Sequence, residues 1–86
     1  MKKYICPVCG YSDLEEPPRD KNGMPSFDIC DCCGVEFGYE DLTEESMIKY
    51  RKKWIETGGE WFIKESKPNN WTMQEQLKNI GIQLNK

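Results

Sequence analysis

The sequence contains no histidine and no long run of apolar residues. Without histidine, the chain lacks the side chain that most often acts as a general base near neutral pH, so we do not expect an enzyme. Without a long apolar run, no segment is expected to span a membrane. Residues 1–5 also lack the apolar stretch of a secretory signal, which favours a cytoplasmic location.

The chain is short and acidic, with 86 residues and a formal net charge of −3. A domain of this size buries a small fraction of its surface and often needs a metal or disulfides for stability. Residues 1–46 carry four basic and eleven acidic side chains, whereas residues 47–86 carry eight basic and four acidic ones. This acidic balance disfavours nucleic acid as a partner, because phosphate contacts require positive charge. The basic run within residues 49–53 is typical of a solvated helix face.

The five cysteines are the most informative residues. Four of them form two Cys-x-x-Cys-Gly segments, at residues 6–10 and 30–34, and 20 residues separate Cys9 from Cys30. This spacing is typical of paired turns that present four sulfur atoms to one tetrahedral metal ion, either zinc or iron. Cytosolic cysteines stay reduced, and an odd number of cysteines disfavours a pure disulfide framework. We expect one Zn²⁺, with one Fe as the alternative, bound by Cys6, Cys9, Cys30 and Cys33.

Cys32 is a fifth thiol inside the second segment. The spacing of the first segment favours Cys30 and Cys33 as the metal ligands and leaves Cys32 outside the ligand set. One interpretation is a small side chain that turns away from the metal. The other is a possible reactive thiol that takes part in redox chemistry or links the chain to a partner.

The chain divides into two parts that we expect to pack as one compact domain. Residues 1–40 contain all the cysteines, with short strands predicted at Lys3–Ile5 and Ser26–Ile29. Residues 41–86 contain all three tryptophans and two helical patterns. The fold class that we predict is a small α+β metal-stapled domain, in which zinc-ribbon or rubredoxin-like β knuckles are followed by two helices.

Helix signals are clear at two places in the second part. Thr43 is a predicted N-cap, and Gly58-Gly59 ends the helix that follows it. Residues 72–75 have the form of a capping box, and the short helix that they open is predicted to end at Gly81. Residues 60–63 give no clear assignment, and residues 82–84 are predicted to form a final strand.

The first of these helices is amphipathic, with an apolar arc opposite the lysines. Arg51 falls inside the apolar arc, so we expect its stem to pack and its head to pair with an acidic residue of the first part. Four large aromatic residues of residues 41–86 form a possible partner surface, because aromatic side chains anchor interfaces. The same residues could instead form the core, although adjacent residues cannot easily both be buried on one side. These residues are Trp54, Trp61, Phe62 and Trp71.

Residues 4–11 together with residues 33–37 resemble the knuckles of rubredoxins and of zinc ribbons. A rubredoxin resemblance implies one iron on four cysteines and the transfer of single electrons. The whole chain is similar to small bacterial proteins of the cysteine-rich CPCC type, in its knuckles, in Glu16–Pro18 and Gly23–Phe27, and in its tail. Asp31 stands where that family's name implies proline. The resemblance implies a zinc-ribbon-like fold without an established activity, and some of these proteins look like candidates for immunity roles beside toxin systems.

We therefore predict a small zinc-binding bacterial protein, in which a structural zinc on four cysteines supports a protein-interaction module. We expect it to be a monomer that binds a protein partner, which the sequence does not identify. A rubredoxin-like electron-transfer protein with one iron is the first alternative. An immunity-type protein of a toxin system is the second.

Overall fold

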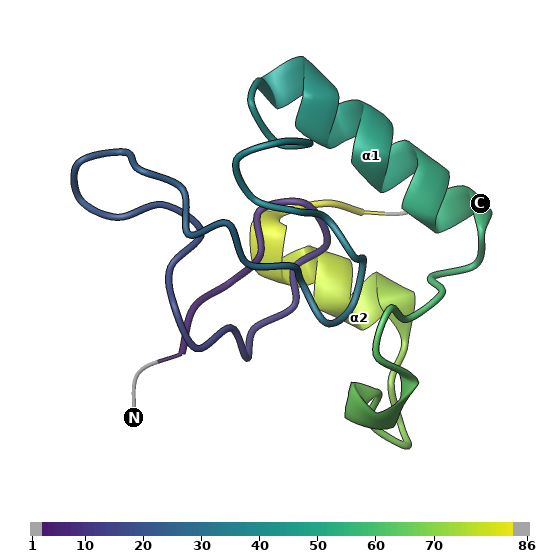
Figure 1. The fold of residues 1–86 in the computed structure, drawn as a ribbon. Helices are drawn as coiled ribbons and strands as arrows, with labels where there is room; N and C mark the ends of the chain where they lie inside the picture. The colour runs from purple at the N-terminus through teal and green to yellow at the C-terminus, as the bar shows by residue number, and fades with distance from the viewer. Residues whose placement is uncertain (1–2, 84–86) are drawn as a thin grey trace.

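Helices occupy the C-terminal half of the chain, and loops occupy the N-terminal half. The computed structural model describes residues 3–83. The helical elements, in chain order, are α1 (Glu44–Glu56), η1 (Lys64–Ser66), α2 (Met73–Leu77) and η2 (Lys78–Ile80). In Figure 1, α1 lies at the top, α2 lies near the centre, and one loop of the N-terminal half projects to the left.

The predicted strands are reduced to isolated antiparallel bridges. Tyr4 pairs with Leu14, and Ile29 pairs with Glu36. A further bridge joins the two sides of the loop between residues 19 and 25. Turns interrupt the chain too often for these pairs to extend into a ladder, and no longer strand occurs within residues 3–83. The segments predicted as strands therefore supply single pairs that fix the cysteine turns.

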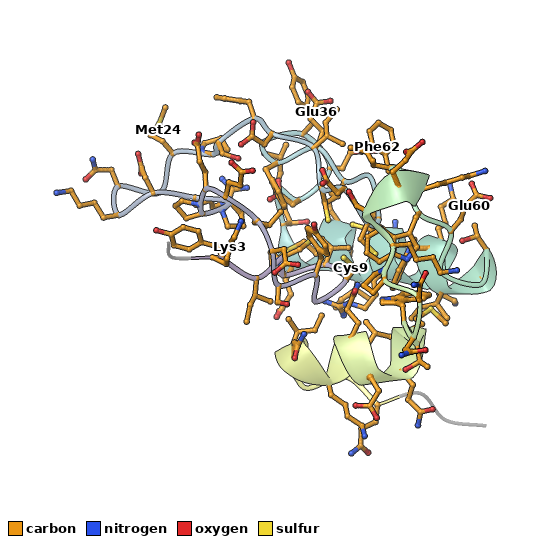
Figure 2. All side chains as sticks on the ribbon, turned by 90° about the horizontal axis from the view of Figure 1, so that it is seen from below. Lys3, Cys9, Met24, Glu36, Glu60 and Phe62 are labelled. Atoms are coloured by element: carbon orange, nitrogen blue, oxygen red, sulfur yellow. The ribbon has the colours of Figure 1, made fainter. Side chains whose placement is uncertain are left out.

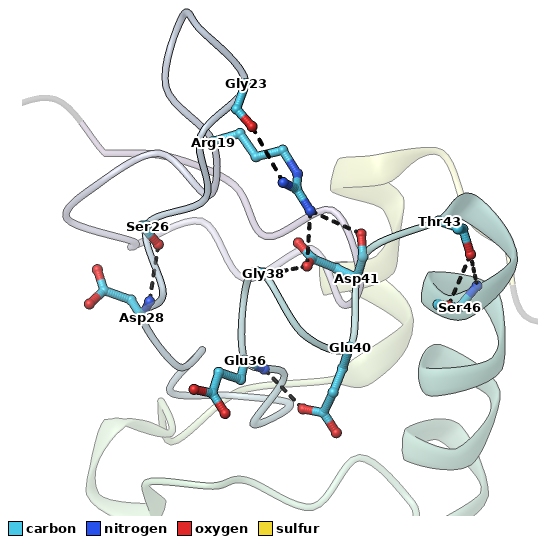
Figure 3. A network of polar contacts seen from close by, with 10 residues as sticks. All are labelled: Arg19, Gly23, Ser26, Asp28, Glu36, Gly38, Glu40, Asp41, Thr43 and Ser46. Carbon is cyan, nitrogen blue, oxygen red and sulfur yellow. Dashed lines mark hydrogen bonds and ion pairs between the residues drawn. The ribbon is translucent and has the colours of Figure 1, made fainter.

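Helix α1 begins and ends where the sequence predicts. The Oγ1 atom of Thr43 accepts a hydrogen bond from the backbone N–H of Ser46 at 3.0 Å, which satisfies one free donor of the first turn (Figure 3). Gly58 and Gly59 both have positive φ, and the N–H of Gly59 donates to the carbonyl of Trp54. This bond satisfies a carbonyl of the last turn, and the positive φ values of the two glycines end the helix.

Helix α2 also has the predicted start, but it is shorter than the pattern suggests. Thr72 accepts a hydrogen bond from the backbone N–H of Glu75 at 3.2 Å, as in a capping box. The α-helical turn ends at Leu77, and η2 continues the chain to Gly81, which has a φ of 73°. The final strand predicted for residues 82–84 is not formed at residues 82 and 83, and residue 84 lies outside the described residues.

One loop projects from the N-terminal half and is tied to the start of α1 (Figures 1 and 3). Within this loop, Oδ1 of Asp20 accepts hydrogen bonds from the N–H groups of Asn22 and Met24. At its base, Arg19 pairs with Asp41 at 3.1 Å, and the Asp41 side chain is only 1% exposed. This ion pair joins the loop to the segment that leads into α1.

The cysteines lie at the centre of the hydrophobic core. Figure 2 shows Cys9 in the interior, while Met24, Glu36, Glu60 and Phe62 lie toward the outside. All five cysteines are buried, together with seven apolar or aromatic side chains from both halves of the chain. Those seven are Val8, Leu14, Val35, Phe37, Trp54, Trp61 and Leu77. The five cysteine side chains therefore make up a large part of the hydrophobic core of this small chain.

Within residues 3–83, no helix combines the length and the apolar character that crossing a membrane requires.

Candidate metal centre

The first cysteine turn, residues 6–11, is closed by two backbone hydrogen bonds. The N–H of Cys6 donates to the carbonyl of Tyr11 at 2.8 Å, and the N–H of Gly10 donates to the carbonyl of Cys6 at 2.9 Å. Gly10 has a φ of 88°, a conformation that glycine adopts without steric cost. The turn therefore needs glycine after its second cysteine.

The second cysteine turn, residues 30–35, repeats this pattern. The N–H of Cys30 donates to the carbonyl of Val35 at 3.0 Å, and the N–H of Gly34 donates to the carbonyl of Cys30 at 3.0 Å. Gly34 has a φ of 80°. The equal spacing of the two Cys-x-x-Cys-Gly segments thus produces two turns with the same backbone hydrogen bonds.

The two turns bring four buried sulfur atoms together. The Sγ atoms of Cys6, Cys9, Cys30 and Cys33 all lie within 4.8 Å of one another. The Cys6–Cys33 distance is 4.0 Å and the Cys9–Cys30 distance is 3.7 Å. A tetrahedral ion with metal–sulfur bonds of about 2.3 Å separates its sulfur ligands by about 3.8 Å. The four cysteines are therefore arranged so that they can hold a metal ion.

Electrostatics give a second reason for a cation at this position. Hydrogen bonds from Cys33, Cys6 and Cys9 lower the pKa of Cys30 well below its usual value. The hydrogen bond to Cys30 is the largest cause that raises the pKa of each of the other three thiols, and burial raises them further. Without a cation the cluster favours a single thiolate, whereas a bound metal ion would stabilise all four.

Arg51 of α1 holds the outer side of the first cysteine turn. Its Nε donates to the carbonyl of Val8 at 2.7 Å, and its terminal NH2 donates to the carbonyl of Pro7 at 3.0 Å. The prediction that Arg51 pairs with an acidic residue is therefore wrong. Carbonyls that point out of a tight turn have no backbone donor within the turn, and the guanidinium satisfies two of them at once. Its positive charge also partly offsets the negative charge of nearby thiolates.

Gln76 of α2 connects the turn to the tryptophans. Its Nε2 atom donates to the carbonyl of Cys9 at 3.2 Å and to the Sγ of Cys32 at 3.1 Å. Its Oε1 atom accepts a hydrogen bond from Nε1 of Trp71 at 2.7 Å. A third side chain, Asn79, donates to the carbonyl of Gly10 at 2.9 Å. Side chains from α1, α2 and η2 therefore bind the four carbonyls of residues 7–10.

The second cysteine turn is held in the same way, mainly by residues 60–63, which had no clear assignment from the sequence. The N–H of Phe62 donates to the carbonyl of Cys32 at 2.9 Å, and the N–H of Ile63 donates to the carbonyl of residue 31 at 2.8 Å. The hydroxyl of Tyr50 donates to the carbonyl of Cys33 at 3.1 Å. Burial is the largest cause that raises the pKa of Tyr50 to about 12, so this hydroxyl stays a donor at neutral pH.

Cys32 does not belong to the four-sulfur group. Its side chain is fully buried, and its sulfur accepts the hydrogen bond from Gln76. That this side chain turns away from the metal ligands stays a prediction. A fully buried thiol is not accessible to a reagent or to a partner thiol.

The four aromatic residues of the predicted partner surface have different positions. Trp54 and Trp61 are each 4% exposed and belong to the core. Trp71 is half-buried, and its indole N–H is used by Gln76. Phe62 is 59% exposed. Of the two adjacent residues Trp61 and Phe62, one is therefore buried and the other exposed.

Sequence reasoning missed the hydrogen-bonding side chains around the turns, chiefly Gln76, Asn79 and Tyr50. The one signal in the sequence was Arg51, a charged residue inside an apolar helix arc. Gln76 and Asn79 stand in a short helix pattern where a polar residue is ordinary. Gln76 binds a carbonyl that lies 67 positions earlier in the chain, and Asn79 binds one that lies 69 positions earlier.

Comparisons place the chain beside two bacterial proteins. No family model and no solved structure matches it. It is 33% identical over 94 residues to the uncharacterized protein YozI of Bacillus subtilis strain 168, covering 91% of this chain and 73% of that protein. It is 39% identical over 72 residues to the uncharacterized protein YoaQ of the same organism, covering 66% of this chain and 61% of that protein. The chain therefore belongs to the family of YozI.

Proposed function

We propose that this chain binds one Zn²⁺ through Cys6, Cys9, Cys30 and Cys33, and that the zinc holds together a module that binds another protein. The observation that carries the proposal is the group of four buried sulfur atoms within 4.8 Å of one another. Zinc with four thiolate ligands is typical of structural sites and contributes directly to folding. The repeated hydrogen bonds of the two cysteine turns also support a zinc-ribbon-like arrangement of the cysteine-rich CPCC type.

A non-catalytic role is part of this proposal. Four sulfur ligands fill the coordination shell of a tetrahedral ion and leave no position for water or a substrate. The sequence has no histidine to act as a base beside the metal. The thiols must remain reduced to bind a metal, which fits a reducing compartment such as the cytoplasm.

Electron transfer with one iron is the second candidate function. Four cysteine sulfurs bind iron as well as zinc. Cys33 is 7% exposed, while the other three cysteines of the group are fully buried. Cys33 is therefore the least buried residue of the group and would be the exit for an electron.

The metal is tested by expressing the protein in medium that holds both zinc and iron. We expect about one zinc per chain and no visible colour. One iron per chain and a red protein, also at native expression levels, would favour electron transfer instead. A folded chain without any metal would contradict both candidates.

A further inference from the structure

A hollow of about 660 Å³ on the N-terminal half is lined mainly by carboxylates. Its charged lining residues are Asp13, Glu15, Glu16, Asp28, Asp31 and Lys3. We refer to it as the acidic groove. Within residues 3–83, the Asp31 carboxylate accepts a hydrogen bond from Ser66, and the other four carboxylates have no ion pair or side-chain hydrogen bond. The groove therefore presents a net negative charge, since Lys3 is the one basic residue among the described residues of its lining.

An aromatic pocket of about 340 Å³ adjoins the acidic groove, since Tyr11 and Asp13 line both. Its wall includes the rings of Tyr11, Trp61 and Trp71. The Tyr11 and Trp61 rings lie 5.6 Å apart at 88°, and the Trp61 and Trp71 rings lie 5.5 Å apart at 81°. Glu75 adds a second carboxylate to the lining. Ring faces and carboxylates together attract a cationic group.

Two further observations at this pocket point to a peptide ligand. The Nζ atom of Lys67 lies 5.3 Å from the centre of the Trp71 ring, so an ammonium group already packs over one ring of this cluster. Trp61, which is 4% exposed, has a buried Nε1–H with no acceptor among residues 3–83. A buried donor without a partner is costly, and a peptide carbonyl would satisfy it if binding opens the pocket wall at Trp61.

We propose that the acidic groove and the aromatic pocket together bind a lysine- or arginine-rich segment of another protein. Basic side chains of that segment lie along the carboxylates of the groove, and one of them enters the aromatic pocket. The inference rests on the proposed function, because it assigns a partner class to the zinc-held module. Nucleic acid does not fit this surface, since its phosphates carry the same sign of charge as the groove.

The test uses metal-loaded protein and a synthetic peptide of alternating lysine and glycine that carries a fluorescent label. Binding is followed by fluorescence anisotropy, with a glutamate–glycine peptide as the negative control. We expect saturable binding of the lysine peptide alone, and weaker binding as salt is added. A peptide with acetylated lysines should lose most of the affinity, because it keeps the carbonyls but not the charge.

Two triple variants of equal net charge distinguish binding at the acidic groove from general electrostatic attraction to an acidic protein. The groove variant is Asp13→Asn, Glu15→Gln and Asp28→Asn. The matched control removes three carboxylates that do not line the groove or the pocket, by Glu44→Gln, Glu56→Gln and Glu60→Gln. We expect the groove variant to weaken binding about tenfold and the control to change it by less than about twofold. Equal weakening in the two variants would overturn the proposal.

Metal content, measured on the same samples, distinguishes a failure of the acidic groove inference from a failure of the proposed function. Protein that contains zinc and is folded but does not bind the lysine peptide contradicts the acidic groove inference alone. Protein without metal contradicts the proposed function itself. Sedimentation of the protein alone tests whether a second copy occupies the groove. Dimers that the groove variant abolishes would reassign the surface to self-association and overturn the assignment to another protein.

Discussion

At the scale of single residues, the position of each sulfur atom separates Cys32 from the four clustered cysteines. Cys32 lies outside the cluster and accepts a hydrogen bond from Gln76. We expect Cys32→Ala to keep one metal ion per chain while losing about 1–2 kcal/mol of stability, because it removes a buried sulfur and leaves Gln76 short of one partner. Cys9→Ser should lose the metal. Metal analysis with chemical denaturation checks both, and metal loss in the alanine variant would contradict our assignment of ligands.

Arg51 and Lys52 offer a matched comparison within α1. Arg51 binds two carbonyls of the first cysteine turn, whereas Lys52 is exposed. Arg51→Met should lower the free energy of unfolding of the metal-loaded protein by about 2–3 kcal/mol, since hydrogen bonds to charged groups contribute more than neutral ones. Lys52→Met should change it by less than about 0.5 kcal/mol. Equal effects in urea denaturation would mean that Arg51 contributes only its charge.

At the scale of elements, alanine substitutions at two glycines can measure how closely the first cysteine turn packs against α2. Gly10 and Gly23 have similar φ values of 88° and 82°, so alanine meets a similar backbone cost of about 1 kcal/mol at each. A Cβ on Gly10 would stand directly against the carbonyl oxygen of Gln76, whereas a Cβ on Gly23 would meet nothing within 4 Å. We expect Gly10→Ala to cost at least about 2 kcal/mol more than Gly23→Ala.

Thermal or urea denaturation of the two glycine variants measures this difference. A similar loss in both would show that α2 can move away from the turn at little cost. Tryptophan fluorescence provides a second readout, because α2 carries the side chain that binds Trp71. Gly10→Ala should change the emission, and Gly23→Ala should leave it unchanged.

The elements also show how far local sequence signals reach. Thr43 and Thr72 mark the helix starts, because capping depends on residues three positions apart. The strand segments form only single bridges, since a ladder requires partners that periodicity alone does not reveal. Residues 60–63 had no clear pattern because their backbone pairs with the second cysteine turn, about 30 positions earlier.

At the scale of the whole molecule, the outward carbonyls of both cysteine turns are bound by residues 50–79. Folding of the C-terminal half and binding of the metal are therefore expected to be one cooperative event. Removing the metal with a chelator should cause loss of the helical circular dichroism signal and expose the buried tryptophans, and zinc should restore both. Hydrogen exchange at the amides of Phe62 and Ile63 should speed up together with the loss of metal, because both donate to the second turn.

A helical signal that survives complete removal of the metal would contradict this coupling. The apo protein of Cys9→Ser offers an independent check, as it should resemble the chelated wild-type chain. Cys32→Ala serves as the control, since it should respond to the chelator as the wild type does.

The cysteine cluster was accessible to sequence reasoning because each pair of cysteines is local and the two pairs share one spacing. The contacts around the cluster were not, because they join residues far apart in the chain. Arg51 lies 43 positions from Val8, and Asn79 lies 69 positions from Gly10. A single sequence shows which groups need partners, but it does not show which distant side chain supplies them.

The projecting loop around Gly23 has a practical consequence for experiments on this protein. The loop closes on itself through Asp20, and its tip stands in open space, away from the sulfur cluster. It is therefore the place to insert an affinity tag or a reporter domain, because exposed loop tips tolerate insertions best. A fusion at this tip leaves both cysteine turns and both helices continuous, and differences in length among relatives are expected to collect at the same position.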